Sequence, residues 1–221
     1  MGSDKAFLQL AGKPLIEHAV TKLRRVCDEV SILGSDPRLG EYASIVTDIH
    51  PGSGPMGGME AGLLHPHSWH EWNLFLPVDV PFLPSAYLHA WTHHACPSAE
   101  KVGAFVWVFT VDSRPQPTVA LIHRRVGPFL TESLERGDYK LLPGLEHAAG
   151  ELAERSGFER GAGLVNVPYW SDFYSRPGPN PRENWRYTTP AQEQYSAHWF
   201  DNLNTPEEFA EAEQHLDALD T

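Results

Sequence analysis

Hydrophobic positions recur at helical spacing near the start of the chain. They lie three or four residues apart, and Pro14 precedes them at the position that suits a first helical turn. The positions are Leu15, Ile16, Ala19, Val20, Leu23, Val26 and Cys27. This spacing predicts an amphipathic helix that begins near Pro14, whereas residues 1–12 predict only a loop and a short hairpin.

Short β-rich runs and helical patterns alternate after this helix. The run NLFLPVDVPFLP is typical of a strand covered on both faces of a parallel sheet, with Pro77 at its end. The other predicted strands are EVSILG, SIVTD, VGAFVWVF, PTVALIH and GLVNV, and the helical patterns cover about 84–94, 126–136 and 141–155. The alternation indicates an α/β fold with a doubly wound, mostly parallel sheet and helices on both faces.

The last third of the chain departs from this alternation. Residues 168–199 carry many prolines and aromatic residues, which is typical of an ordered surface excursion and not of a disordered linker. The run TPEEFAEAEQHLDAL then predicts a closing helix, with Thr205 and Glu208 as a capping box. A length of 221 residues fits one domain, 1–221, with an insertion at about 168–199.

Charge and composition exclude several classes of protein. There are 29 acidic and 17 basic residues, a net charge of −12 that opposes non-specific nucleic-acid binding, so a polyanionic ligand needs a local positive site. The two cysteines, Cys27 and Cys96, are far apart and indicate a reducing compartment. Because we find neither an 18-residue apolar run nor a signal-peptide pattern, we expect a cytoplasmic protein that does not bind membranes.

Two stretches of the first half have residues suited to binding phosphate and metal. Asp79 follows an apolar strand, at the end where α/β sheets bind ligands, and its carboxylate suits Mg²⁺; equally, it could cap the next turn. The run GSGPMGGMEAGLL is a glycine-rich loop that leads into a helix. Gly54 and Gly57 allow close backbone approach to an anion, although a plain flexible turn explains the same glycines.

Lys5 and two asparagines are further candidates. Lys5 can neutralise a phosphate, but its position, taken alone, favours the interpretation as an exposed surface lysine. Asn202 and Asn204 precede the closing helix, where they serve as turn and cap residues or line a polar cleft. The twelve histidines have no convincing zinc spacing, and no G-x-S-x-G elbow supports a serine hydrolase.

In sequence order, five motifs resemble the molybdenum cofactor guanylyltransferase family, and more broadly the nucleotidyltransferases that share its Rossmann-like fold. They are MGSDKAFLQLAGKPLIEH, SGPMGGMEAGL, LPVDVPFLP, QPTVALIHR and NLNTPEEF. The first matches only the latter half of the family's N-terminal signature, because the glycine-rich half is absent. We therefore expect further residues upstream of Met1, since losing the first strand would expose the interior of the sheet.

The resemblance implies a role for each matching residue. Gly2, Lys5, Asp48, Gly54, Gly57 and Asp79 would bind the nucleotide. Of these, Lys5 would contact its phosphates and Asp79 would ligate Mg²⁺, so that both would be catalytic. Asn202 and Asn204 would lie on the acceptor side.

The implied reaction is attack by the terminal phosphate of molybdopterin on the α-phosphorus of GTP, with release of pyrophosphate. Such chemistry needs positioning and charge neutralisation, and no protein nucleophile. Proteins that make or accept the molybdenum cofactor are further candidate partners.

Two alternatives stay open. One is a related transferase that uses CTP or a sugar phosphate, although the pair Asp4 and Lys5 leans toward GTP. The other is a homologue that binds nucleotide or cofactor without catalysis. Leu33 stands where some members of the family have an asparagine that contacts nucleotide, so that contact is in doubt here.

Overall fold

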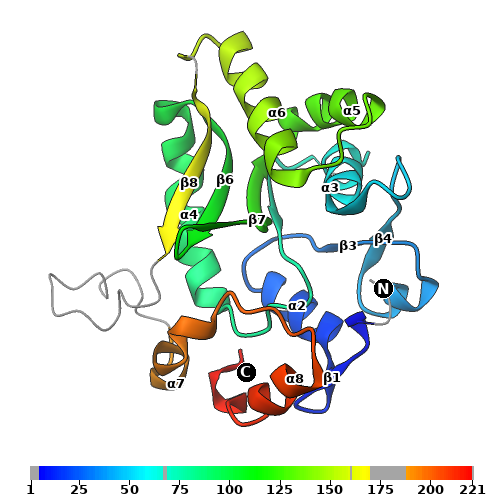
Figure 1. The fold of residues 1–221 in the computed structure, drawn as a ribbon, viewed down its shortest axis with the longest axis vertical. Coiled ribbons are helices and arrows are strands. Elements are labelled where there is room, and N and C mark those ends of the chain that lie inside the picture. Colours follow the sequence, from blue (N-terminus) through cyan, green and yellow to red (C-terminus); the bar gives the residue numbers. More distant parts are fainter. Residues whose placement is uncertain (1–4, 67–68, 160, 170–187, 221) are drawn as a thin grey trace, which may run out of the picture. The chain divides into compact units, whose positions relative to one another are not determined.

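The computed structural model describes residues 5–66, 69–159, 161–169 and 188–220 (Figure 1). These residues divide into two compact units. Unit 1 takes its described residues from Met1–Val30, Leu76–His93 and Tyr169–Thr221. Unit 2 takes its described residues from Ser31–Phe75 and His94–Pro168.

Unit 2 contains most of the β-structure. Its strands are β3 (Ser31–Leu33), β4 (Ser44–Val46), β5 (Trp72–Phe75), β6 (Ala104–Val111), β7 (Arg114–His123) and β8 (Gly163–Tyr169, whose last residue falls in unit 1). Its helices are α3 (Gly54–Leu64), α5 (Gly127–Glu135) and α6 (Leu141–Arg155). Strands β3 and β4 pair in parallel, and a four-stranded sheet has the order β5-β7-β6-β8. The predicted α/β class is confirmed.

The sheet is mixed, whereas the sequence pattern predicts mostly parallel pairing. Strand β7 pairs antiparallel with both β5 and β6. The cause is a two-residue hairpin, because Asp112 and Ser113 between β6 and β7 have φ of 45° and 67°. Positive φ at both positions is the geometry of a tight hairpin turn, and the chain must therefore reverse here. The apolar run at β5 accordingly lies in an antiparallel pair with β7.

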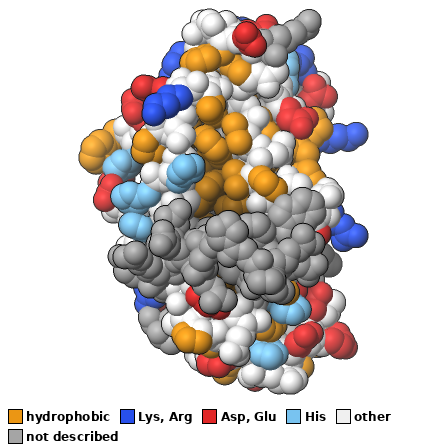
Figure 2. All heavy atoms as spheres, turned by 90° about the vertical axis from the view of Figure 1, so that its left-hand side faces the viewer, with side chains coloured by type: hydrophobic (Ala, Val, Ile, Leu, Met, Phe, Trp, Pro, Cys, Tyr) orange, Lys and Arg blue, Asp and Glu red, His pale blue; other side chains and the backbone are white. Residues whose placement is uncertain are grey.

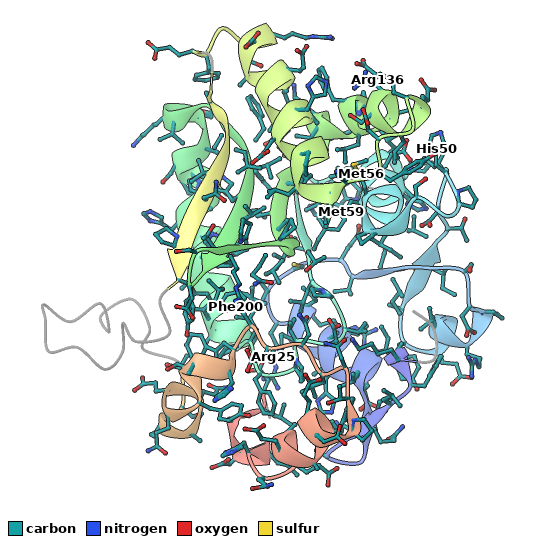
Figure 3. The ribbon with its side chains drawn as sticks, in the orientation of Figure 1. Arg25, His50, Met56, Met59, Arg136 and Phe200 are labelled. Atoms are coloured by element: carbon teal, nitrogen blue, oxygen red, sulfur yellow. The ribbon has the colours of Figure 1, made fainter. Side chains whose placement is uncertain are left out.

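The core of unit 2 lies between its helices and its sheet. Buried side chains of α3, α5 and α6 pack against those of β6 and β7. Met56 and Met59 of α3 point into this core (Figure 3) and are 0% and 4% exposed. Figure 2 looks onto the side on which β8 and α4 (Ser85–Val102) lie in Figure 1, and hydrophobic side chains gather there.

Unit 1 is mostly helical. Its elements are the short hairpin β1 (Gln9–Leu10) and β2 (Lys13–Pro14), helix α2 (Leu15–Leu23), the first half of α4, α7 (Pro190–Gln194) and α8 (Pro206–Ala212). Helix α2 starts as predicted but ends before Cys27, because the amides of Arg25 and Val26 bond to the carbonyls three residues back and tighten the last turn. The predicted capping box of Thr205 and Glu208 is confirmed at the start of α8.

The insertion is described only in part. Residues 170–187, with Trp170 and Trp185, lie outside the described residues. In the described part, Trp199 is 1% exposed, donates its indole N–H to the carbonyl of Gln192 at 2.9 Å, and packs with Tyr87 and Tyr169. At Trp199, the aromatic content of this segment therefore stabilises unit 1.

Among the described residues, we find no helix that is both long enough and apolar enough to cross a membrane.

Candidate functional site

Three of the predicted site residues meet in unit 1. The Nζ atom of Lys5 lies 2.5 Å from Oδ2 of Asp79 and also donates to Oδ1 of Asn204. These partners are 74 and 199 positions away in the sequence. The side chains of Lys5 and Asp79 are 23% and 18% exposed, so a ligand can reach the pair. Lys5 therefore has two side-chain partners, which its position in the sequence, taken alone, does not indicate.

Backbone contacts fix Asp79 in place. It lies in the loop between β5 and α4, and its carbonyl accepts a 2.9 Å hydrogen bond from the amide of Leu203. Leu203 stands between Asn202 and Asn204, so the NLNTPEE motif lies directly beside Asp79 of the LPVDVPFLP motif. The segment that leads into the capped start of α8 thus also holds the backbone of Asp79.

The capping box of α8 holds Asn204. The carboxylate of Glu208 accepts from the amide of Asn204 at 2.5 Å and from that of Thr205 at 2.8 Å. These two backbone hydrogen bonds, the first being the larger cause, lower the pKa of Glu208. The carboxylate of Glu208 therefore keeps its negative charge to a lower pH than a free glutamate does.

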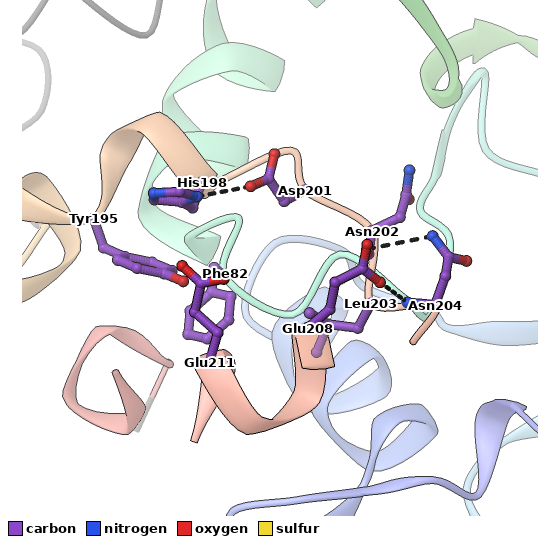
Figure 4. A pocket seen from close by; sticks show the side chains of 9 residues that line it. All are labelled: Phe82, Tyr195, His198, Asp201, Asn202, Leu203, Asn204, Glu208 and Glu211. Carbon is purple, nitrogen blue, oxygen red and sulfur yellow. Dashed lines mark hydrogen bonds and ion pairs between the residues drawn. The ribbon is translucent and has the colours of Figure 1, made fainter. Parts of the chain in front are cut away.

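A pocket of about 390 Å³ opens beside the NLNTPEE motif (Figure 4). It is lined by Phe82, Tyr195, His198, Asp201, Asn202, Leu203, Asn204, Glu208 and Glu211. The amide of Asn204 donates to the carbonyl of Asn202 at 3.3 Å, and His198 lies 2.7 Å from Asp201. Asn202 and Asn204 therefore do line a polar cleft, as one of the two sequence interpretations holds.

The glycine-rich loop forms a second group of candidates, in unit 2. It begins α3, and Gly54 has φ of 64°, which favours glycine. A Cβ on Gly57 would lie 3.1 Å from the carbonyl oxygen of His50, and one on Gly58 would lie 3.6 Å from Oδ1 of Asp48. The carboxylate of Asp48 and the glycine loop are therefore close neighbours, as the predicted nucleotide roles require.

Two further positions complete the predicted set. Gly2 lies outside the described residues. Leu33 packs its side chain against the positions of Gly58 and Gly62, where added Cβ atoms would lie 3.5 Å and 3.2 Å away. Leu33 therefore packs against α3.

Sequence reasoning missed a polar group inside unit 2. Glu60 of α3 is 0% exposed, lies 2.8 Å from Nδ1 of His50, and accepts from the hydroxyl of Thr131 at 2.5 Å. A buried carboxylate needs such partners. The available signal was one charged residue between Met59 and Ala61 in an otherwise apolar helix. Its contacts hold His50, which follows Asp48 by two residues, against α3.

Comparison with known protein families shows which proteins this chain is similar to. The family model for a MobA-like NTP transferase domain matches residues 1–150. A molybdenum cofactor guanylyltransferase of Serratia proteamaculans (strain 568) is 35% identical over 162 residues, which cover 71% of this chain and 77% of that protein. A molybdenum cofactor guanylyltransferase of Yersinia pestis (strain Pestoides F) is 29% identical over 181 residues, 79% of this chain and 88% of that protein.

Solved structures show the same fold. Molybdopterin-guanine dinucleotide biosynthesis protein A from Archaeoglobus fulgidus matches with a TM-score of 0.65 at 22% identity, over 99% of this chain and 93% of that one. A protein from Aquifex aeolicus matches with a TM-score of 0.58 at 17% identity, over 86% and 79%. At these identities the likeness shows the fold alone.

Proposed function

Because the chain belongs to the MobA-like NTP transferase family, we propose that it transfers GMP from GTP to molybdopterin and releases pyrophosphate. It is a nucleotidyltransferase of the molybdenum cofactor guanylyltransferase type. Its curated relatives are molybdenum cofactor guanylyltransferases, and this supports GTP as the donor.

The contact of Lys5 with Asp79 and Asn204 is the observation that carries this proposal. An ammonium group has three N–H donors. Among the described residues, Asp79 and Asn204 take two of them, which leaves one for a phosphate oxygen. In a protein of net charge −12, this lysine supplies the local positive charge that a triphosphate needs.

The oxygen atoms around Lys5 suit Mg²⁺. A carboxylate and an amide oxygen already converge on one cation, the ammonium of Lys5, and both are hard oxygen donors. The described residues hold no group of three His, Cys, Asp or Glu side chains that could bind a metal without substrate. Asp79, with the phosphates of GTP, would therefore hold Mg²⁺, which when bound neutralises phosphate charge during transfer.

The acceptor would bind on the side of Asn202 and Asn204. Both side chains line the pocket, and their amides can donate and accept hydrogen bonds. Asn204 also accepts a hydrogen bond from Lys5, so the pocket adjoins that lysine. Phe82 and Tyr195, whose ring centroids are 4.6 Å apart, give this pocket an aromatic wall. The aromatic wall and the two amides suit a flat, hydrogen-bonding ring system.

The chemistry that these residues would perform is positioning. An oxygen of the terminal phosphate of molybdopterin forms a bond to the α-phosphorus of GTP. The bond from that phosphorus to the β-bridging oxygen breaks, and pyrophosphate leaves with the electron pair. Lys5 would hold the phosphate oxygens while their charge shifts, and the amides would orient the acceptor in line.

Nucleotide choice is testable by thermal unfolding. With Mg²⁺ and GTP at about one hundred times its Kd, binding should stabilise the native state by about 2.7 kcal/mol and raise Tm by roughly 5–10 °C. CTP at the same concentration should raise Tm by less than about 2 °C, because it would be far from saturation. Differential scanning fluorimetry in parallel wells measures both.

An equal or larger shift with CTP would contradict the choice of GTP and favour the cytidylyl alternative. No shift with any nucleotide, at concentrations up to several millimolar, would contradict a nucleotide site altogether.

A further inference from the structure

Lys22 of helix α2 is 1% exposed, although most lysines lie in water. It follows Leu15 by seven residues and Ala19 by three, so the helix turns it toward the same side as its apolar stripe. Burying an ammonium group costs free energy unless its N–H groups find acceptors. The position of Lys22 therefore depends on what its amine contacts.

The amine of Lys22 contacts the loop that carries Asp79. Its Nζ atom donates to the carbonyl oxygen of Pro81 at 2.7 Å and to that of Val80 at 3.3 Å. These are the two residues that directly follow Asp79. Lys22 thus satisfies two backbone carbonyls of a stretch in which Pro81 itself has no N–H to donate.

Other parts of unit 1 hold the same loop at its two ends. The amide of Leu203 donates to the carbonyl of Asp79 at 2.9 Å. The carboxylate of Asp220 accepts from the amide of Ser85, where α4 begins, at 2.8 Å and from the side chain of Gln192 at 3.0 Å. The backbone from Asp79 to Ser85 is thus held from α2, from the NLNTPEE motif and from the end of the chain.

We infer that Lys22 is a positioning residue for Asp79: by holding the carbonyls of Val80 and Pro81, it fixes the direction in which the carboxylate of Asp79 meets Lys5 and Asn204. The assignment rests on the proposed function, since it gives Asp79 its part in nucleotidyl transfer. Lys22 itself touches no reacting group, because it acts from inside unit 1 on the backbone of the loop.

The buried charge of Lys22 does not stabilise the folded protein, so stability does not explain why a lysine stands at this position. The pKa of Lys22 is lowered from 10.5 to about 8: burial is the largest cause, the charge of Asp220 opposes it, and the charge of Arg25 adds to it. The folded pKa lies below the unfolded one, so the unfolded chain binds more protons between pH 8 and 10.5, and stability rises with pH there. Below pH 8 the buried charge disfavours folding, which offsets part of the stability that Lys22→Met loses with its two hydrogen bonds.

The test compares Lys22→Met with Lys13→Met, an exposed lysine of the same unit that pairs with Glu17 at 3.1 Å. Lys22→Met should lower kcat for GTP-dependent pyrophosphate release about 10- to 100-fold, because small misplacements of a reacting group have such effects. The KM for GTP should change less than about threefold, since the loss falls on the transition state. Lys22→Arg, which keeps the donors, should restore part of kcat.

Hydrogen exchange supplies a readout that does not require catalysis. In Lys22→Met the amides of Val78, Asp79, Val80 and Phe82 should exchange faster than in the parent protein, while Tm stays within a few degrees. Lys13→Met should change neither exchange nor kcat. If the parent protein releases no pyrophosphate from GTP, the proposed function fails, and the exchange data still decide whether Lys22 holds the loop.

Two results would overturn the inference. One is a Lys22→Met protein with kcat close to that of the parent; the other is unchanged exchange in residues 78–82. If Lys22→Met does not fold, Lys22→Gln replaces it in the same measurements, because its shorter side chain keeps an N–H donor but cannot span both carbonyls.

Discussion

Replacing Asp79 by asparagine is expected to lower kcat for pyrophosphate release by about 100- to 1,000-fold, the usual cost of losing a group that stabilises charge in a transition state. The change keeps the size of the side chain but removes the charge that would hold Mg²⁺ and that faces Lys5. Stability should change by less than about 1 kcal/mol, because the pair with Lys5 is partly exposed and such ion pairs contribute little.

Asp138→Asn is the matched control, since Asp138 is an exposed aspartate of unit 2 whose carboxylate lies 3.9 Å from Arg136. It should keep full activity. An Asp79→Asn protein that retains half of the parent's rate at saturating Mg²⁺ and GTP would remove Asp79 from the metal role.

Replacing Lys5 by methionine is the second change with a large expected effect. It removes the cation that we assign to the phosphates and leaves the carboxylate of Asp79 without its partner at 2.5 Å. Turnover should fall about 100-fold or more, and the KM for GTP should rise, because a charge-assisted contact to the triphosphate is lost.

Metal binding should change in the opposite direction from turnover. Since the ammonium of Lys5 occupies the carboxylate of Asp79, its removal should leave Mn²⁺ affinity at saturating GTP unchanged or higher. Calorimetric titration with Mn²⁺ measures this. A Lys5→Met protein that loses Mn²⁺ binding and turnover together would indicate local unfolding of the site and contradict a direct phosphate role.

The sequence predicts the elements of this fold better than their pairing. Periodicity locates α2, α6 and β6 close to where they lie, because a buried stripe is a local property. The antiparallel position of β7 depends instead on Asp112 and Ser113, a turn without glycine that gives a weak hairpin signal. Pairing is therefore set by two residues whose conformation the hydrophobic pattern does not report.

The candidate site shows the same division. The resemblance to a known family identifies Lys5, Asp79 and Asn204, which the structure brings into contact. It gives no sign of Lys22 or Glu60, since each lies in an ordinary helical pattern and only burial reveals its hydrogen bonds. Residues that support a site without lining it are recognised by their tertiary contacts, and a single sequence does not show these contacts.

The most direct test of the proposed function follows the α-phosphate of GTP. The protein is incubated with molybdopterin, Mg²⁺ and GTP labelled at the α-phosphate, and the products are separated and identified by mass spectrometry. We expect the label to enter a molybdopterin-guanine dinucleotide, with one pyrophosphate released for each, and to stay in GTP when Asp79→Asn replaces the parent protein. Label that remains in GTP with the parent protein, or a dinucleotide that forms from CTP instead, would contradict guanylyl transfer.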